Sequence, residues 1–322
     1  MATPDDDAPV RTAENYRAFA VEARGRSPWY EELALAVAGD ARVLDFLVAL
    51  PAAKRQPNLL FAAARYLLGE PPDLAALHVL LGNRESELAA TMLARRTQTN
   101  EPARCATLLP ALALLPPPLA IVEVGASAGL TLLADRYSYD YDGHAVAGTD
   151  PGAPVLACQP RGAVPLPRGV PEVAWRAGLD LNPLDVTSDD DVRWLRCLVW
   201  PGETGRQERL SAAIETARRD PPPLYRGNLL TDLPDLVAEA PRGATVVVYH
   251  SAVLGYVHRA DRARFARTVR ELGVVWLSNE GPEVLPGAGT AVSDPHGFIL
   301  SKDGSGPIAV TESHGAWLEW VA

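Results

Sequence analysis

Hydrophobic positions in the first third of the chain recur at helical spacing. Between about Thr12 and Leu115, apolar residues repeat every three or four positions, and glycine or proline closes successive segments. No strand-like alternation interrupts this stretch. Three prolines at positions 116–118 then prevent a helix from continuing. The pattern predicts a helical N-terminal domain or cap over residues 1–117.

After these prolines, short apolar runs rich in β-branched residues alternate with helical patterns, which is typical of buried parallel strands joined by helices. The expected parallel strands lie near residues 119–124, 173–180, 224–226, 245–251 and 273–280. The other expected elements are a helix from Leu130, an insertion of loops or short strands at 143–170, and an antiparallel strand pair at 297–300 and 316–321. Residues 118–322 are therefore predicted to form an α/β domain with a Rossmann-like, doubly wound sheet.

The first expected strand ends in Glu123-Val-Gly125-Ala-Ser127-Ala-Gly129. Side chains this small let a backbone turn tightly and let a ligand approach the N–H groups that open a following helix. Gly125-x-Ser127-x-Gly129 also has the spacing of a nucleophile elbow, in which a serine occupies a strained strand-to-helix turn. A third interpretation is a turn whose small residues serve only packing. The loop alone does not choose among these three.

Polar residues also follow the later expected strands. Asp180 is placed to bind ribose hydroxyls, because a carboxylate accepts hydrogen bonds from both hydroxyls of a diol. Asn228, His250 and Glu280 end three further strands. In doubly wound sheets, ligands bind beyond the carboxyl ends of strands, so we expect Glu123 and Asp180 to face one crevice. A capping role for Asp180 and a structural role for His250 are the alternatives.

A dense polar cluster precedes the three prolines. It contains Gln98, Asn100, Glu101 and Arg104. One interpretation is a solvated turn between two helices. The other is a lid whose polar groups bind a ligand lying on the Gly125 loop.

Composition narrows the class of protein. The chain has 322 residues and a net charge of −10, which argues against binding to a nucleic-acid backbone. Its three cysteines, Cys105, Cys158 and Cys197, are far apart and predict neither a disulfide framework nor a metal site. The acidic N-terminus lacks the apolar core of a signal peptide, and no apolar run has membrane-spanning length. We expect a cytoplasmic protein without nucleic-acid or membrane partners. The oligomeric state is left open.

The pattern Glu123-x-Gly125-x-x-x-Gly129, followed by Gly178-Leu-Asp180-Leu-Asn-Pro and by Gly227-Asn228, resembles the class I S-adenosylmethionine-dependent methyltransferase fold. The whole chain also resembles an uncharacterised bacterial family, known as a domain of unknown function, that joins a helical N-terminal part to such a core. The segments that carry this second resemblance are residues 98–101, 122–129, 179–183, 250–254 and 276–281.

The methyltransferase resemblance implies S-adenosylmethionine as cofactor and an unidentified, small-molecule acceptor. It implies that Glu123, Gly125 and Gly129 surround the methionine part of the cofactor, that Ser127 also belongs to the cofactor-binding loop, and that Asp180 holds the ribose. Asn228 stands where such enzymes often carry an aspartate that contacts adenine, which is a departure from the pattern. The long insertion before Asp180 is another departure.

Methyl transfer needs a base only where the acceptor must lose a proton, and His250 and Glu280 are the candidate catalytic residues for that step. One alternative is a serine hydrolase with Ser127 as nucleophile, and its histidine would be His296 after Asp294, or His314. Against it, a hydrolase of this kind has several strands before its elbow, whereas the pattern from Thr12 to Leu115 predicts helices. The other alternative is a non-catalytic nucleotide-binding protein that kept the fold.

Overall fold

A computed structural model describes residues 7–98, 100–284 and 297–322. Contacts between Cα atoms divide the chain into two compact units. Unit 1 contains residues 1–99 and 189–208, and unit 2 contains residues 100–188 and 209–322. This division differs from the expected boundary at 117/118 in two respects: residues 100–117 group with the sheet, and residues 189–208 group with the N-terminal helices.

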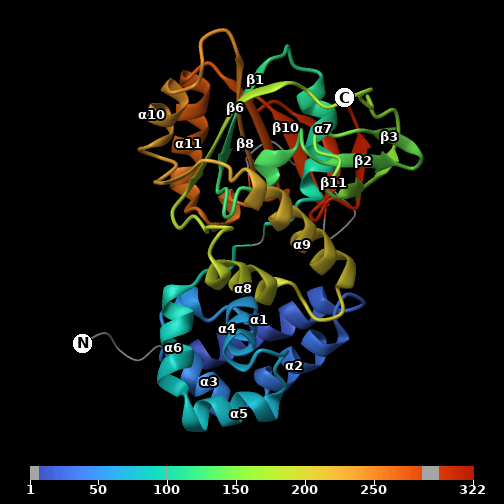
Figure 1. The fold of residues 1–322 in the computed structure, drawn as a ribbon. Helices are drawn as coiled ribbons and strands as arrows, with labels where there is room; N and C mark the ends of the chain where they lie inside the picture. The colour runs from blue at the N-terminus through green and yellow to red at the C-terminus, as the bar shows by residue number, and fades with distance from the viewer. Residues whose placement is uncertain (1–6, 99, 285–296) are drawn as a thin grey trace. The chain divides into compact units, whose positions relative to one another are not determined.

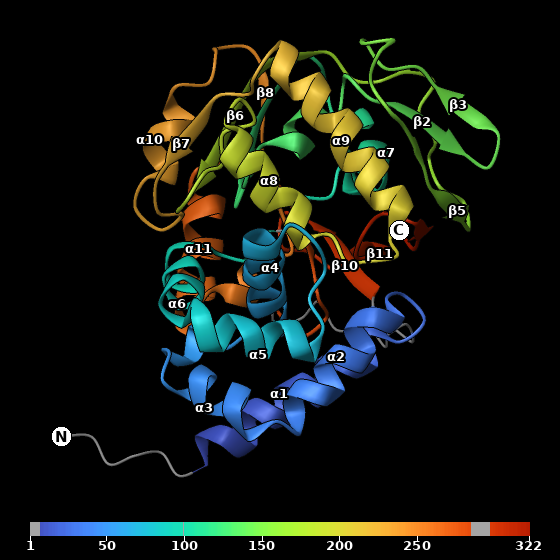
Figure 2. The same ribbon diagram turned by 60° about the horizontal axis from the view of Figure 1, so that its bottom comes forward.

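Unit 1 is helical, in agreement with the sequence pattern. Its helices are α1 (Ala8–Ala23), α2 (Pro28–Ala38), α3 (Ala41–Val48), the 3₁₀ helix η1 (Ala52–Lys54), α4 (Pro57–Leu68), α5 (Leu74–Asn83), α6 (Glu85–Ala94), α8 (Asp189–Leu198) and the first part of α9 (Thr204–Arg219). Helices α1 and α2 run side by side in Figures 1 and 2. Ser27 caps α2 by accepting a hydrogen bond from the Tyr30 amide, as its place before Pro28 suggests.

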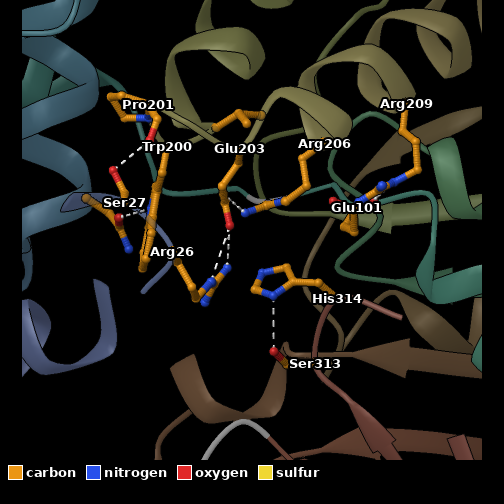
Figure 3. A network of polar contacts seen from close by, with 12 residues as sticks. Arg26, Ser27, Glu101, Trp200, Pro201, Glu203, Arg206, Arg209, Ser313 and His314 are labelled. Atoms are coloured by element: carbon orange, nitrogen blue, oxygen red, sulfur yellow. Dashed lines mark hydrogen bonds and ion pairs between the residues drawn. The ribbon is translucent and has the colours of Figure 1, made fainter. Parts of the chain in front are cut away.

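An aromatic cluster forms the core of unit 1. It consists of Tyr16, Phe19, Tyr30, Phe61 and Trp200. Offset and edge-to-face aromatic contacts of this kind stabilise a core beyond the apolar area they bury. Close by in the same unit, Glu203 accepts hydrogen bonds from Arg26 and Arg206, and the Arg26 guanidinium lies over the Trp200 ring (Figure 3).

Unit 2 is built on a large mixed sheet. Among the described residues, nine strands form one sheet in the order β5-β12-β11-β10-β9-β8-β1-β6-β7. The parallel strands at its centre are β1 (Leu119–Val124), β6 (Val173–Asp180), β7 (Leu224–Arg226), β8 (Thr245–Ser251) and β9 (Val275–Glu280). Numbered along the chain, these five strands have the order 3-2-1-4-5, which is the order of a doubly wound sheet.

The edge of the sheet beyond β9 differs from expectation. The chain adds β10 (Gly297–Lys302), β11 (Pro307–Glu312) and β12 (Trp317–Trp320) as an antiparallel meander, and β5 (Gln159–Arg161) pairs with β12. The expected pairing of residues 297–300 with 316–321 is wrong, because β11 lies between them. The insertion at 143–170 carries short strands, as expected. A second sheet joins β2 (Ser138–Tyr141), β3 (His144–Val146) and β4 (Val155–Ala157).

Layers cover both faces of the large sheet. One face packs against α10 (Leu233–Ala238) and α11 (Arg259–Glu271) through an apolar cluster that includes Val122, Val248 and Trp276. Figure 1 shows these two helices on one side of the sheet, and α7 (Arg104–Ala113) with the smaller sheet on the other. Within the part of the chain that the structure describes, no helix is long and apolar enough to cross a membrane.

Candidate functional site

The candidate site lies at the carboxyl edge of the parallel strands. Strand β1 is flanked by β6 on one side and β8 on the other, and the strand order reverses there. Such a switch point is where doubly wound sheets bind ligands. In the register, Glu123 is opposite Gly178 and Tyr249, and Asp180 follows Gly178 by two residues. Side chains alternate between faces along a strand, so Glu123 and Asp180 project from the same face.

Glu123 is enclosed by the protein. It is 4% exposed, and its carboxyl group accepts hydrogen bonds from the Thr131 hydroxyl and, at 3.4 Å, from the Tyr249 hydroxyl. Burial raises the pKa of Glu123 from 4.5 to about 8, although both hydroxyls and the charge of Arg104 oppose that change. Glu123 is therefore mainly protonated near neutral pH, and it links the end of β1 to Thr131, beyond the loop, and to Tyr249 on β8.

Most N–H groups of the loop after β1 already donate hydrogen bonds to other parts of the protein. The amides of Gly125 and Ala126 donate to the Leu179 carbonyl oxygen at 2.7 and 3.3 Å. The Ser127 amide donates to Oδ2 of Asp180 at 2.9 Å. These amides bind protein acceptors in this structure, and the loop is held against the end of β6.

The expected helix from Leu130 is wrong. Only a four-residue 3₁₀ helix, η2 (Leu130–Leu133), follows the loop. The Tyr137 hydroxyl donates to the Leu130 carbonyl oxygen at 2.7 Å, and this oxygen would accept the next turn's amide in an α-helix. Asn100 Oδ1 accepts from the Leu130 amide at 2.8 Å, so that amide also has a protein partner.

Two glycines of the loop are required by neighbouring protein side chains. Gly125 has a φ of +73°, and a Cβ built on it would lie 2.4 Å from Cγ2 of Val253. Gly129 has a φ of +70°, and its Cβ would lie 2.7 Å from Cγ of Pro222. Real Cβ atoms do not approach other heavy atoms this closely, so both positions need glycine for packing as well as for backbone conformation. In this structure Val253 occupies the space over Gly125.

Asp180 has a structural role that the sequence left as an alternative. Its Oδ2 binds the Ser127 amide, and its Oδ1 accepts from the Asn182 amide at 2.7 Å. The side chain is half-buried, and the apolar side chain of Leu181 beside it is 56% exposed. Asn228 is exposed at the end of β7, where its Oδ1 accepts from the Leu230 amide.

The expected lid residues are divided between the units. Gln98 belongs to unit 1, whereas Asn100, Glu101 and Arg104 belong to unit 2. Asn100 is buried against the loop after β1, donating to the Ala126 carbonyl oxygen at 3.3 Å. Asn100 therefore holds the loop in place by hydrogen bonds to its backbone.

Glu101 and Arg104 are also buried at this edge. Glu101 accepts from the Ala103 amide and forms an ion pair with Arg209 at 3.2 Å (Figure 3). Arg104 donates to the carbonyl oxygens of Ser313 at 2.8 Å and Ser251 at 3.2 Å. Buried charges are costly unless they are paired, so their concentration here marks the edge as the strongest site candidate in unit 2.

The two expected catalytic residues lie on the opposite face. His250 is wholly buried, with Nδ1 2.7 Å from Oε1 of Glu280, and its Nε2 accepts from Nε1 of Trp276 at 3.0 Å. Because the Trp276 indole only donates, Nε2 carries no proton and Nδ1 carries it. Both ring nitrogens are thus bonded within the core, and the imidazole lies on the other face of the sheet from Glu123.

The turn between β11 and β12 was not identified from the sequence as part of this edge. Glu312 Oε2 accepts from the amides of His314 and Ala316, and Ser313 Oγ lies 3.1 Å from Glu312 Oε1. Ser313 Oγ also lies 3.2 Å from His314 Nδ1 (Figure 3). Although burial raises the pKa of Glu312, the hydrogen bond and charge of His314 and the two amides lower it to about 2. The missed signal was β11 itself, whose end lies at the same edge as the ends of β8 and β9.

Other residues of this edge also come from strand ends. Asn279 donates to Ser251 Oγ at 3.1 Å and accepts from Thr311 Oγ1 at 2.8 Å. Asp294 and His296, considered for the hydrolase alternative, lie outside the described residues. Within residues 7–98, 100–284 and 297–322, no three His, Cys, Asp or Glu residues are grouped to hold a metal ion.

Comparison with known proteins identifies the family. A family model described as "Uncharacterized protein conserved in bacteria (DUF2332)" matches residues 13–320. The chain belongs to this family. The match extends through both compact units, so the helical part and the sheet are both parts of the family's common chain. A search of curated proteins found no match.

Proposed function

We propose that unit 2 binds S-adenosylmethionine and transfers its methyl group to a small-molecule acceptor. The observation that supports this most is the position of Asp180, a half-buried carboxylate at the end of β6 on the same sheet face as Glu123. It lies beside the switch point of a sheet whose parallel strands have the order 3-2-1-4-5. In Rossmann-like folds an acidic residue at this strand end holds ribose hydroxyls.

The described residues fit the nucleoside end of such a cofactor. Asp180 supplies carboxylate oxygens, each of which has two acceptor positions. Leu181 presents an exposed apolar side chain next to it, and Asn228 supplies an amide at the end of the adjoining strand. An apolar surface with a few polar groups suits a nucleoside. At the methionine end, Val253 covers Gly125, so binding there needs this side chain to move.

Bound S-adenosylmethionine supplies a methyl group that is already activated for transfer. The protein's part is then to position the acceptor and to exclude water, which accounts for large rate effects without covalent catalysis. Buried Asn100 holds the loop and buried Arg104 holds the end of β8 for that purpose. His250 and Glu280 do not act as acid–base groups in this proposal, because their contacts lie within the core.

Isothermal titration of the full chain with S-adenosylmethionine tests the proposal. We expect saturable binding that weakens at least about tenfold in Asp180→Asn, because one ribose acceptor is lost. Asp235→Asn, an exposed substitution in α10, is the matched control and should bind like the unsubstituted protein. Absence of binding at millimolar cofactor refutes the proposal. Binding without transfer to any acceptor favours the non-catalytic alternative.

One observation favours a hydrolase as second candidate. Ser127 has a φ of +52°, the left-handed conformation that strains a non-glycine residue and that an elbow nucleophile needs. The same residue is 3% exposed, and η2 replaces the helix that follows such elbows. Covalent labelling by a fluorophosphonate probe that disappears in Ser127→Ala supports this candidate. An unlabelled protein excludes it.

A further inference from the structure

The segment between β8 and η3 (Leu254–Tyr256) closes over the glycine loop. Val253 in this segment meets Gly125 so closely that a Cβ on the glycine would lie 2.4 and 2.8 Å from the two methyl carbons of Val253. Ala252, immediately before it, has a φ of +58°, a conformation that costs free energy for a non-glycine residue. A strained residue persists where surrounding contacts hold it. The contacts that hold this one identify what keeps Val253 in place.

A single carboxylate oxygen holds the segment. Oε1 of Glu280 accepts from the amides of Val253 at 2.9 Å and Leu254 at 3.0 Å. The same oxygen lies 2.7 Å from Nδ1 of His250, whose proton it accepts. Through the two backbone amides, Glu280 fastens the segment to β9. The Ala252 amide adds a bond to the Asn279 carbonyl oxygen at 3.0 Å.

The other side of His250 is fixed as well. Nε1 of Trp276 donates to Nε2 of His250 at 3.0 Å, and the Phe265 ring packs edge-on against the imidazole. His250, Glu280 and Trp276 are each at most 2% exposed. A buried hydrogen-bond network of this kind rigidifies the groups that it joins. The network therefore determines where the backbone of Val253 lies.

We propose that Glu280, oriented by His250, is a positioning residue that holds Val253 over Gly125, and that a ligand reaches the glycine loop only when this contact opens. The inference rests on the proposed function, because it concerns access to the same loop. It gives His250 and Glu280 a role that does not require them to touch substrate. Where the competent state is a minor population, the apparent affinity is reduced by that fraction, so loosening the contact should strengthen binding.

Four variants of the full chain separate the steps of this argument. Val253→Ala removes the methyl groups that cover Gly125. Glu280→Ala removes the acceptor oxygen, whereas Glu280→Gln keeps an oxygen that can accept from both amides and from His250. Val237→Ala, in α10 at the edge of the apolar cluster, is the matched control for loss of a packed valine. Hydrogen exchange of residues 250–257 and titration with S-adenosylmethionine are measured for each.

In Glu280→Ala, we expect the amides of Val253 and Leu254 to exchange at least about tenfold faster, and in Glu280→Gln to exchange nearly as in the unsubstituted protein. This result does not depend on any ligand. We expect Val253→Ala and Glu280→Ala to bind S-adenosylmethionine about tenfold more tightly, and Val237→Ala to bind as before. If Glu280→Gln matches the unsubstituted protein in both amide exchange and binding, the result supports the positioning role of Glu280.

Unchanged exchange in Glu280→Ala overturns the holding role of Glu280. Accelerated exchange together with unchanged binding in both Val253→Ala and Glu280→Ala overturns the role of the contact in ligand access. If none of the proteins binds S-adenosylmethionine, the proposed cofactor is refuted, and the exchange rates still decide whether Glu280 holds the segment. Val253→Ala keeps the test available should Glu280→Ala fail to fold.

Discussion

Replacing Glu123 by glutamine should change how stability depends on pH. The carboxyl group is 4% exposed, and its pKa in the folded protein is raised from 4.5 to about 8, chiefly by burial. The folded state therefore binds more protons than the unfolded state between these two values. Stability is fully present below pH 4.5 and is lost as pH rises through about 8. Glutamine cannot ionise and removes this loss.

The expected slope follows from the two values. Each pH unit between 4.5 and about 8 should cost the unsubstituted protein about 1.4 kcal/mol of unfolding free energy relative to Glu123→Gln. From about pH 5 to about pH 7.5 the gap should widen by roughly 3 kcal/mol. Glutamine can accept from Thr131 and donate to the Tyr249 oxygen, so the two proteins should be similarly stable near pH 5.

Urea unfolding at a series of pH values measures this gap. Glu271→Gln, at the exposed end of α11, is the matched control, since it makes the same substitution outside the core. The reasoning is refuted if the difference between Glu123→Gln and the unsubstituted protein is constant with pH or narrows as pH rises. It is also refuted if the control reproduces the same widening gap.

Three further substitutions test other contacts. Gly125→Ala should cost about 2–4 kcal/mol of unfolding free energy, because of the positive φ and the contact with Val253. Combining it with Val253→Ala should restore part of this loss. Additive losses in a double-mutant cycle measured by urea unfolding contradict this prediction. Asn100→Ala should cost about 1–3 kcal/mol by leaving the Leu130 amide without its acceptor, and faster exchange of that amide checks the cause. Glu312→Gln should reduce the loss of stability as pH falls from 4.5 towards 2, because the pKa of Glu312 in the folded protein is lowered to about 2. The free energy of unfolding, measured by urea at each pH, checks this. An unchanged loss between pH 4.5 and 2 contradicts it.

Local pattern was sufficient to locate most elements of the sheet. β1 and β8 begin and end at the expected residues, because buried parallel strands are short runs of β-branched residues that contrast with their flanks. β11 was missed. The helix expected from Leu130 failed for a different reason: its apolar residues are buried on all sides, and Tyr137 takes the Leu130 carbonyl oxygen. Periodicity shows which residues are apolar. It does not show when a distant side chain forms a hydrogen bond with a backbone group that a helix would otherwise use.

The sequence predicted the location of the candidate site, at the carboxyl edge of the sheet, but not its chemistry. Glu123, Asp180 and Asn100 were identified because strand ends and polar turns are where α/β proteins bind ligands. Their partners come from distant segments, and these partners decide the chemistry. Asp180 binds the Ser127 amide, and His250 accepts a hydrogen bond from Trp276 in the core. A carboxylate that caps a loop and one that awaits a ligand look the same in sequence.

By itself, the sequence determined an α/β chain with a helical N-terminal region, the central strands, and the polar residues that end them. Only the tertiary structure decided that Val253 covers Gly125, that Glu123 is buried enough to hold its proton, and that both ring nitrogens of His250 are bonded to Glu280 and Trp276. The physical reason is that secondary structure follows from the spacing of residues within a segment. Burial, ionisation and access follow from which other segments pack against it.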